Sequence, residues 1–218
     1  MAENLPDPAK PLMRGWLHLG AAPFALIAGM ILVVFAPTLA GRVSTAVFTL
    51  TAVMLFGTSA VYHRGNWGPT AKAVLRRMDH ANIFLIIAGT YTPLTVMLLE
   101  GTTRTAVLIT VWAGALVGLL LRIFWLGAPR WLYVPLYVAL GWVAVGFMGP
   151  FYEAGGAAVV TLIVIGGLCY TVGAVIYGTK WPRGSVKYFG FHEIFHALTI
   201  AGFLCHYVAI ALVVFTVT

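Results

Sequence analysis

The feature that most constrains this chain is a series of long apolar runs separated by short polar breaks. A helix needs about 20 mostly apolar residues to cross the hydrocarbon layer of a membrane. Seven runs meet that length, at residues 16–37, 43–63, 79–99, 103–123, 131–151, 156–178 and 190–214. The chain is 61% hydrophobic and only 9% charged, which is outside the range of ordinary globular domains. We therefore expect an all-α membrane protein, a bundle of seven transmembrane helices that forms one domain over residues 1–218.

The basic residues fall almost entirely on one side of this seven-helix arrangement. Eleven of the 13 lie in the N-terminal segment or in the loops after the second, fourth and sixth runs: Lys10, Arg14, Arg64, Lys72, Arg76, Arg77, Arg122, Arg130, Lys180, Arg183 and Lys187. Only Arg42 and Arg104 lie on the other side. Because cytoplasmic loops carry the excess of Lys and Arg, the pattern predicts a cytoplasmic N-terminus and a C-terminus outside. It indicates a multi-pass protein of the cell (plasma or inner) membrane.

Other compositional features exclude several classes of protein. The net charge of +7 does not indicate nucleic-acid binding, because the basic residues sit in short loops and not on a soluble face. Cys169 and Cys205 both lie within apolar runs, so we predict neither a disulfide framework nor a CxxC motif. The N-terminal segment has no apolar core followed by a cleavage site, so we expect no removable signal peptide. The expected partners are membrane lipids, one of them a candidate substrate.

Ionisable side chains within the apolar runs are costly to bury and usually face the interior of a helix bundle. With the orientation above, His63 ends the second run on the cytoplasmic side, and Asp79 opens the third run on that side. His192 and His196 lie in the first turns of the seventh run, again on that side. We therefore expect these four groups to share one depth in the membrane.

These groups have the composition of a metal site. His192 and His196 are four residues apart, so their side chains stack on one helix face about 6 Å apart and could bind one ion. His63 could supply a third ligand, with Ser59 one turn earlier to orient its ring or hold a water. Asp79 could hydrogen-bond that water or act as a base. Three protein ligands plus a water are typical of catalytic zinc, so we predict a Zn²⁺ site with Asp79 and Ser59 in catalytic roles.

Simpler interpretations exist for each residue. A histidine pair with this spacing also occurs by chance, and Asp79 could cap the third helix and pair with Arg76 or Arg77. His18 and His80 could be interfacial residues.

His206 lies ten residues beyond His196, about 15 Å along a helix, so it fits an interior hydrogen-bonding histidine better than a ligand. The expected convergence of four groups at one depth favours the metal site over these alternatives.

The string HEIFH at 192–196 also matches the HExxH signature of zinc metalloproteases, in which the glutamate is the general base. Glu193 points about 100° from His192 around the helix, as in those enzymes, so helix geometry does not exclude an intramembrane protease. The alternative is that Glu193 pairs with a loop cation such as Lys187 at the membrane surface.

Three segments of the chain resemble the signatures of one family. GTSAVYHRGNW (57–67), MDHANIFLIIAGTYTP (78–93) and HEIFHALTIAGFLCHYVAI (192–210) are similar to those of the hemolysin III family. That family is the bacterial branch of the progestin and adipoQ receptor family and is related to alkaline ceramidases. The resemblance covers essentially the whole chain, and three motifs in order are more specific than HExxH alone.

The resemblance implies a zinc ion held by the histidine that closes the second helix and the two that open the seventh, here His63, His192 and His196. The motif serine matches Ser59, and the aspartate that contacts a water on the zinc in relatives matches Asp79. In the receptor branch the residue that matches Glu193 is often glutamine, which argues against a protease base.

The function we favour from the sequence is that of a zinc-dependent hydrolase of a lipid amide or ester, and only the resemblance supplies the lipid. Zinc would lower the pKa of a water to about 7 and polarise the substrate carbonyl, while Asp79 takes or relays the proton. The alternatives are a receptor-like or membrane-homeostasis protein with a structural zinc, and a pore-forming hemolysin. The apolar runs show no obvious ion-lining stripe, which argues against a pore.

Overall fold

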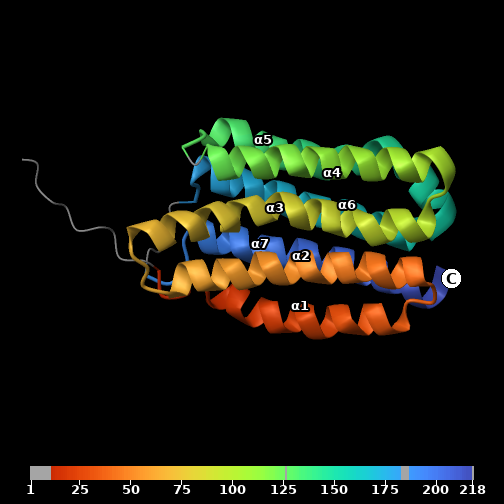
Figure 1. The fold of residues 1–218 in the computed structure, drawn as a ribbon, viewed down its shortest axis with the longest axis horizontal. Coiled ribbons are helices and arrows are strands. Elements are labelled where there is room, and N and C mark those ends of the chain that lie inside the picture. Colours follow the sequence, from red (N-terminus) through yellow and green to blue (C-terminus); the bar gives the residue numbers. More distant parts are fainter. Residues whose placement is uncertain (1–10, 126, 183–186, 218) are drawn as a thin grey trace, which may run out of the picture.

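The computed structural model describes residues 11–125, 127–182 and 187–217, and all regular structure in these residues is helical, as predicted. Its elements are α1 (Trp16–Phe35), α2 (Leu39–Arg64), α3 (Pro69–Leu98), α4 (Gly101–Phe124), α5 (Arg130–Gly141), the 3-10 helix η1 (Trp142–Phe147), α6 (Met148–Thr179), α7 (Phe191–Leu212) and the π-helical turn η2 (Val213–Val217). The helices lie side by side along the long axis of an elongated bundle (Figure 1). Lys10 and Arg183, two of the residues that predict the orientation, lie outside the described residues.

The run formed by α5, η1 and α6 folds back on itself. Gly156 within it is non-helical (φ 75°, ψ 178°), in a region of backbone space that glycine enters without steric cost. The Trp142 indole donates a hydrogen bond to Thr171 Oγ1 at 2.8 Å, and Arg130 Nη1 donates to the Tyr177 carbonyl at 2.9 Å. Because both bonds join residues on opposite sides of Gly156, the chain reverses near this glycine, close to the predicted break between the fifth and sixth apolar runs.

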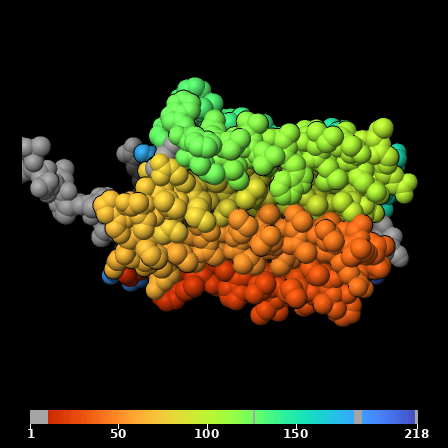
Figure 2. All heavy atoms as spheres, viewed as in Figure 1, coloured from red at the N-terminus to blue at the C-terminus, as the bar shows by residue number. Residues whose placement is uncertain are grey.

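The helices are long and apolar enough to cross a membrane. Six helical runs in the described part of the chain meet that test, with residues 130–179 counted as one. The outer faces of α1 and α4 expose large apolar side chains, among them Ile27, Val34, Ile109 and Val117. Figure 2 shows α1 to α4 forming one closely packed face of the bundle. Apolar surface of this extent suits lipid, and the prediction of a multi-pass integral membrane protein is confirmed.

The first third of α3 lies outside the predicted span. We expected the helix to begin at Asp79, but it begins ten residues earlier, with Pro69 in the first turn, where its missing N–H removes no hydrogen bond. These extra turns carry Lys72 and Arg76 and are too polar to count as an apolar run. The length of the helix therefore exceeds the length of the span that hydropathy detects.

Helix α3 is the central element of the bundle. In its most apolar stretch 72% of the residues are buried, compared with 28% in α4. A small residue allows α2 to approach it closely, because a Cβ on Gly89 would lie 2.0 Å from Thr51 Oγ1. Small residues at helix contacts are the usual means of close packing in membrane proteins, where no difference in hydrophobicity drives helices together. This packing fixes the depth of the polar residues that α3 carries.

Candidate metal centre

Three histidines converge at the end of the bundle where α2 finishes and α7 begins. One ring nitrogen from each of His63, His192 and His196 lies within 4.8 Å of the other two. Nε2 of His192 is 3.1 Å from Nε2 of His63. Two nitrogens bound tetrahedrally to one zinc ion, each at about 2.0–2.1 Å, would be roughly 3.3 Å apart. The three imidazoles therefore lie close enough together to hold a metal ion.

Two helix ends position these rings. His63 lies in the last turn of α2, and His192 and His196 lie one turn apart at the start of α7. The spacing of four residues places the last two rings on one helix face, with their centroids 4.5 Å apart. The centroid of the His63 ring lies 4.8 Å from that of His192 and 5.2 Å from that of His196. The candidate site thus joins residues that are 129 positions apart in the chain.

Asp79 and Ser59 lie next to this cluster. Oδ2 of Asp79 is 3.9 Å from His63 Nε2, and the Asp79 side chain is only 11% exposed. Ser59 is buried one turn before His63, and its hydroxyl faces Asp79 without a hydrogen bond of good geometry. Both residues line the same cavity as His196. The structure thus brings together all five residues that the sequence singled out, and their chemical roles stay predictions.

The simpler interpretation of Asp79 does not fit the structure. Asp79 lies in the third turn of α3, so it cannot cap that helix. Among the described residues, its ion-pair contacts are with His63 and with His80 Nδ1, at 3.8 Å from the latter, and not with Arg76 or Arg77. The carboxylate therefore belongs to the histidine cluster.

The expectation that His80 is interfacial is wrong. His80 is 8% exposed and lines the cavity beside Asp79. Its Nδ1 lies 2.8 Å from the Arg76 carbonyl oxygen, and its Nε2 lies 3.1 Å from the Tyr177 hydroxyl. Nδ1 donates to the carbonyl oxygen, and the two contacts together hold the ring in one orientation.

The same expectation for His18 is also wrong. This α1 residue is 3% exposed, and its ring stacks on that of His196 with centroids 3.8 Å apart and planes 9° apart. The stack restricts rotation of the His196 ring. The depth argument that brought the other residues together applies equally to His18, because the first apolar run starts on the same side, and this signal could have found it.

Glu193 is structural. Its carboxylate is 1% exposed and pairs with Arg14 Nε, and it also accepts a hydrogen bond from the Gly190 N–H at 2.8 Å. The predicted partner, Lys187, is therefore wrong. Through its hydrogen bond the carboxylate caps the Gly190 amide at the start of α7, and through Arg14 it holds the residues before α1 against the helix. Both of its oxygens are engaged away from the histidines, which disfavours a protease base.

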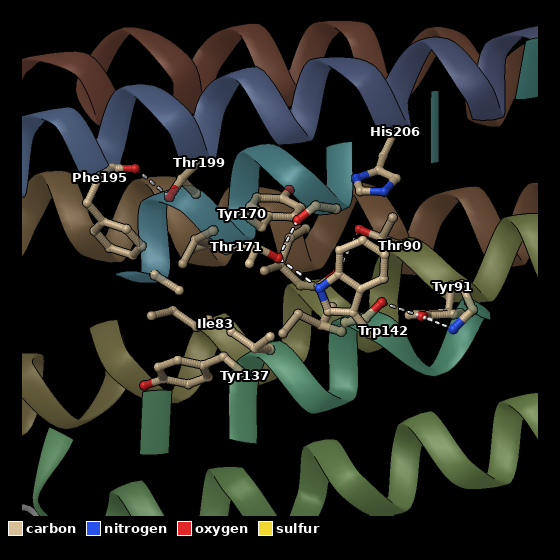
Figure 3. Close-up of a pocket in the computed structure, with 18 of the residues that line it drawn as sticks. Ile83, Thr90, Tyr91, Tyr137, Trp142, Tyr170, Thr171, Phe195, Thr199 and His206 are labelled. Carbon is tan, nitrogen blue, oxygen red and sulfur yellow. Dashed lines mark hydrogen bonds between the residues drawn. The ribbon is translucent and has the colours of Figure 1, made fainter. Parts of the chain in front are cut away.

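Two hollows meet at the histidine cluster. The first is a cavity inside the bundle, lined by His196, Asp79 and Ser59 at one end and reaching His206 at the other. Its walls between these ends are mostly apolar, with Ile83 and Tyr137 among the lining residues (Figure 3). Ten residues of α7 separate His196 from His206, a distance of about 15 Å along the helix.

The second hollow is polar, includes His63 in its lining, and shares His80, Tyr177 and His192 with the cavity. Its lining also includes four basic side chains: Arg14, Lys72, Arg76 and Arg130. The histidine cluster therefore borders both a polar space and an apolar one.

Apolar helices long enough to cross a membrane, enclosing buried histidines and a carboxylate beside an apolar cavity, define a polytopic membrane protein with a candidate metal centre. A family model described as haemolysin-III related matches residues 7–207. The chain belongs to the haemolysin III family.

Two bacterial relatives show the same similarity. The chain is 31% identical over 160 residues to a hemolysin-3 homolog of Bacillus subtilis (strain 168), which covers 73% of this chain and 72% of the relative. It is 27% identical over 165 residues to hemolysin-3 of Bacillus cereus, which covers 76% of this chain and 72% of that protein. The resemblance seen in the three motifs is thus confirmed along most of the chain.

The Arg14–Glu193 pair yields a stability prediction. Arg14→Ala should lower the free energy of unfolding by about 3 kcal/mol, because it leaves the Glu193 carboxylate buried without its counter-charge. The lower end of the range for a buried pair applies, since the Arg14 side chain is 22% exposed. Thermal unfolding in detergent micelles measures the loss. Adding Glu193→Gln to Arg14→Ala should restore part of it, and an Arg14→Ala protein as stable as wild type would contradict the pair's role.

Proposed function

We propose that this protein is a zinc-dependent hydrolase that cleaves an amide or ester bond of a membrane lipid. The observation that carries the proposal is the position of Asp79 and Ser59 beside three convergent histidines at one end of an apolar cavity. An acyl chain would occupy the cavity, and the polar hollow would supply water. The resemblance to alkaline ceramidases supports the lipid amide or ester as the substrate class.

The residues of the site suit this chemistry. A bound zinc ion would polarise the substrate carbonyl and make a nearby water a stronger acid. Asp79 would take a proton from the water as its oxygen attacks the carbonyl carbon, and would pass that proton to the leaving nitrogen or oxygen as the bond to it breaks. The Ser59 hydroxyl would donate a hydrogen bond to the oxygen on which negative charge develops. The products are a fatty acid and an amine or alcohol.

We also propose that the bundle crosses the membrane seven times, with its N-terminus in the cytoplasm. The reversal near Gly156 divides residues 130–179 into two antiparallel segments, which supports a seventh crossing. The histidine cluster and the basic hollow then face the cytoplasm, where the excess of Lys and Arg belongs.

The topology predicts a labelling pattern. In a background without Cys169 and Cys205, Lys72→Cys and Lys187→Cys should react with a membrane-impermeant maleimide only after the cells are opened. Arg104→Cys and Glu153→Cys should react in intact cells. The opposite pattern would overturn the orientation, and labelling of positions 72 and 153 from the same side would overturn the number of crossings.

Metal content tests the donor set. Purified wild-type protein should carry about one zinc ion per chain. His63→Ala, His192→Ala and His196→Ala should each lose most of it, because removal of one of three protein ligands leaves an incomplete site. Elemental analysis of monodisperse protein measures the content. His206→Ala, the same substitution about 15 Å along α7, should keep its zinc, and equal content in all four variants would rule the site out.

Hydrolysis tests the catalytic role of Asp79. Zinc-loaded protein should release fatty acid from ceramides, N-acyl amides or lipid esters, as measured by mass spectrometry. Asp79→Asn should lower kcat about 10²–10⁴-fold, the usual worth of a general base, while zinc content and thermal unfolding stay near wild type. Glu153→Gln, an acid-to-amide change at an exposed position after η1, is the matched control and should keep full activity.

A structural zinc is the second candidate, because the histidine cluster joins the ends of α2 and α7. Zinc removal would then lower the unfolding temperature without any turnover to lose. Absence of hydrolysis by zinc-loaded wild type across all three lipid classes would favour this function over the enzyme.

A further inference from the structure

We infer that the end of the cavity around His206 and Tyr170 is a second recognition site, which binds a hydroxyl group on the chain of the lipid. The inference rests on the proposed function only for the nature of the occupant, a lipid whose chain lies in the cavity. It goes beyond that function because it specifies a polar group far from the bond that is cut.

The first observation is a pair of buried polar atoms that make no hydrogen bond of good geometry. His206 is 8% exposed, and its Nδ1 is one of them among the described residues, while the backbone of Gly202 and of Ile163 also faces the ring. The Tyr170 hydroxyl oxygen is also buried and lacks a partner there. A buried donor or acceptor without a partner costs about 1–3 kcal/mol, and native proteins leave few of them. Two such groups together at a cavity wall indicate a binding site.

The second observation is that the packing holds both rings in place. The His206 and Tyr170 rings stack, with centroids 5.5 Å apart and planes 16° apart. Each ring lies over a glycine of the neighbouring helix, since a Cβ on Gly166 would be 2.6 Å from His206 Cε1 and a Cβ on Gly202 would be 2.9 Å from Tyr170 Cε1. Any larger residue would displace the rings. Figure 3 shows His206 extending from α7 and Tyr170 from α6 toward the interior of the bundle.

The third observation is that the nearby polar side chains have protein partners already. Thr171 Oγ1 donates to the Gly167 carbonyl at 2.8 Å and accepts from the Trp142 indole at 2.8 Å. Thr90 Oγ1 donates to the Ile86 carbonyl at 2.8 Å. The hydrogen bonds of these side chains are thus made to nearby protein groups, and none of the bonds reaches His206 or Tyr170.

The chemistry of the pair selects the ligand group. A neutral imidazole offers one donor and one acceptor, and a tyrosine hydroxyl offers both, which matches an alcohol that donates and accepts in turn. A charged group would lack a counter-charge here, because no Lys or Arg lines the described cavity and its one carboxylate, Asp79, lies at the other end. The separation of about 15 Å along α7 from His196 places the hydroxyl well along the chain, away from the headgroup.

Binding of two fatty acids of equal length tests the inference. The probes are octadecanoic acid and 12-hydroxyoctadecanoic acid, whose hydroxyl lies far along the chain from the carboxyl. Calorimetry with zinc-loaded protein in detergent should show the hydroxy acid binding roughly tenfold more tightly, the worth of one buried hydrogen bond to an otherwise unsatisfied group. Tyr170→Phe, which keeps the ring and removes only the hydroxyl, should reduce the preference to less than about twofold.

Three controls make the result specific. Tyr207→Phe, the same change on a tyrosine that bonds the Ala28 carbonyl outside the cavity, should keep the preference. 2-Hydroxyoctadecanoic acid, with its hydroxyl beside the carboxyl, should show no dependence on Tyr170. His206→Phe keeps a flat ring and removes both nitrogens, so it gives a second test if Tyr170→Phe does not fold.

Equal binding of the two acids by wild type would overturn the inference and indicate that only water occupies this end of the cavity. A preference that survives Tyr170→Phe and His206→Phe would overturn it as well. The readout is binding and not turnover, so absence of hydrolysis would sink the proposed function and leave this inference standing. Hydrolysis without any preference for the hydroxyl would do the reverse.

Discussion

Polar side chains buried among apolar helices must find partners within the protein, and this constraint organises the bundle. Water is absent from the hydrocarbon layer, so a buried ionisable group is costly unless a partner or a cavity accommodates it. Glu193 meets Arg14 and an amide of its own helix, and His80 is held between a carbonyl and a tyrosine hydroxyl. Ser59, Tyr170 and His206 have polar atoms without such partners among the described residues, and all three line the cavity, where a ligand can complete their hydrogen bonds.

Helix α7 connects the two ends of that cavity. Its first turns carry two of the candidate metal ligands, and His206 lies three turns further along. A rigid helix fixes the distance between these groups, as in sites built on regular elements rather than loops. The same helix is held at its start by the Arg14–Glu193 pair and along its length by close packing on α6. The geometry of the site therefore depends on contacts that do not touch it.

The two hollows that border the histidines have opposite character, and this contrast supports the proposed hydrolysis of a lipid. An apolar cavity suits an acyl chain, because a chain that moves from the bilayer into the cavity leaves one apolar environment for another at little cost in free energy. A polar hollow lined by Arg76 and Arg130 suits water and an anionic product. A site with only one of these spaces would lack either room for the acyl chain of the substrate or access for the water that hydrolysis consumes.

The sequence by itself determined the class of fold and most of the candidate site. Apolar runs of a membrane-spanning length fold as helices, because only a helix makes all its backbone hydrogen bonds within a single segment. His192 and His196 are spaced to lie on one helix face, and His63 and Asp79 were expected at the same depth. These two observations were enough to predict that the four side chains lie near one another. The break expected between runs 131–151 and 156–178 also lies close to Gly156, near which the chain reverses.

The tertiary structure decided the contacts that depend on which helix faces pack against each other. Hydropathy measures depth and not rotation, so it could not show that His18 stacks on His196 or that His80 turns inward. It could not choose Arg14 over Lys187 as the partner of Glu193, because both lie near the start of α7. Nor could it reveal that Gly166 and Gly202 make room for a stacked His206 and Tyr170, since such a fit exists only when two helices approach in one register.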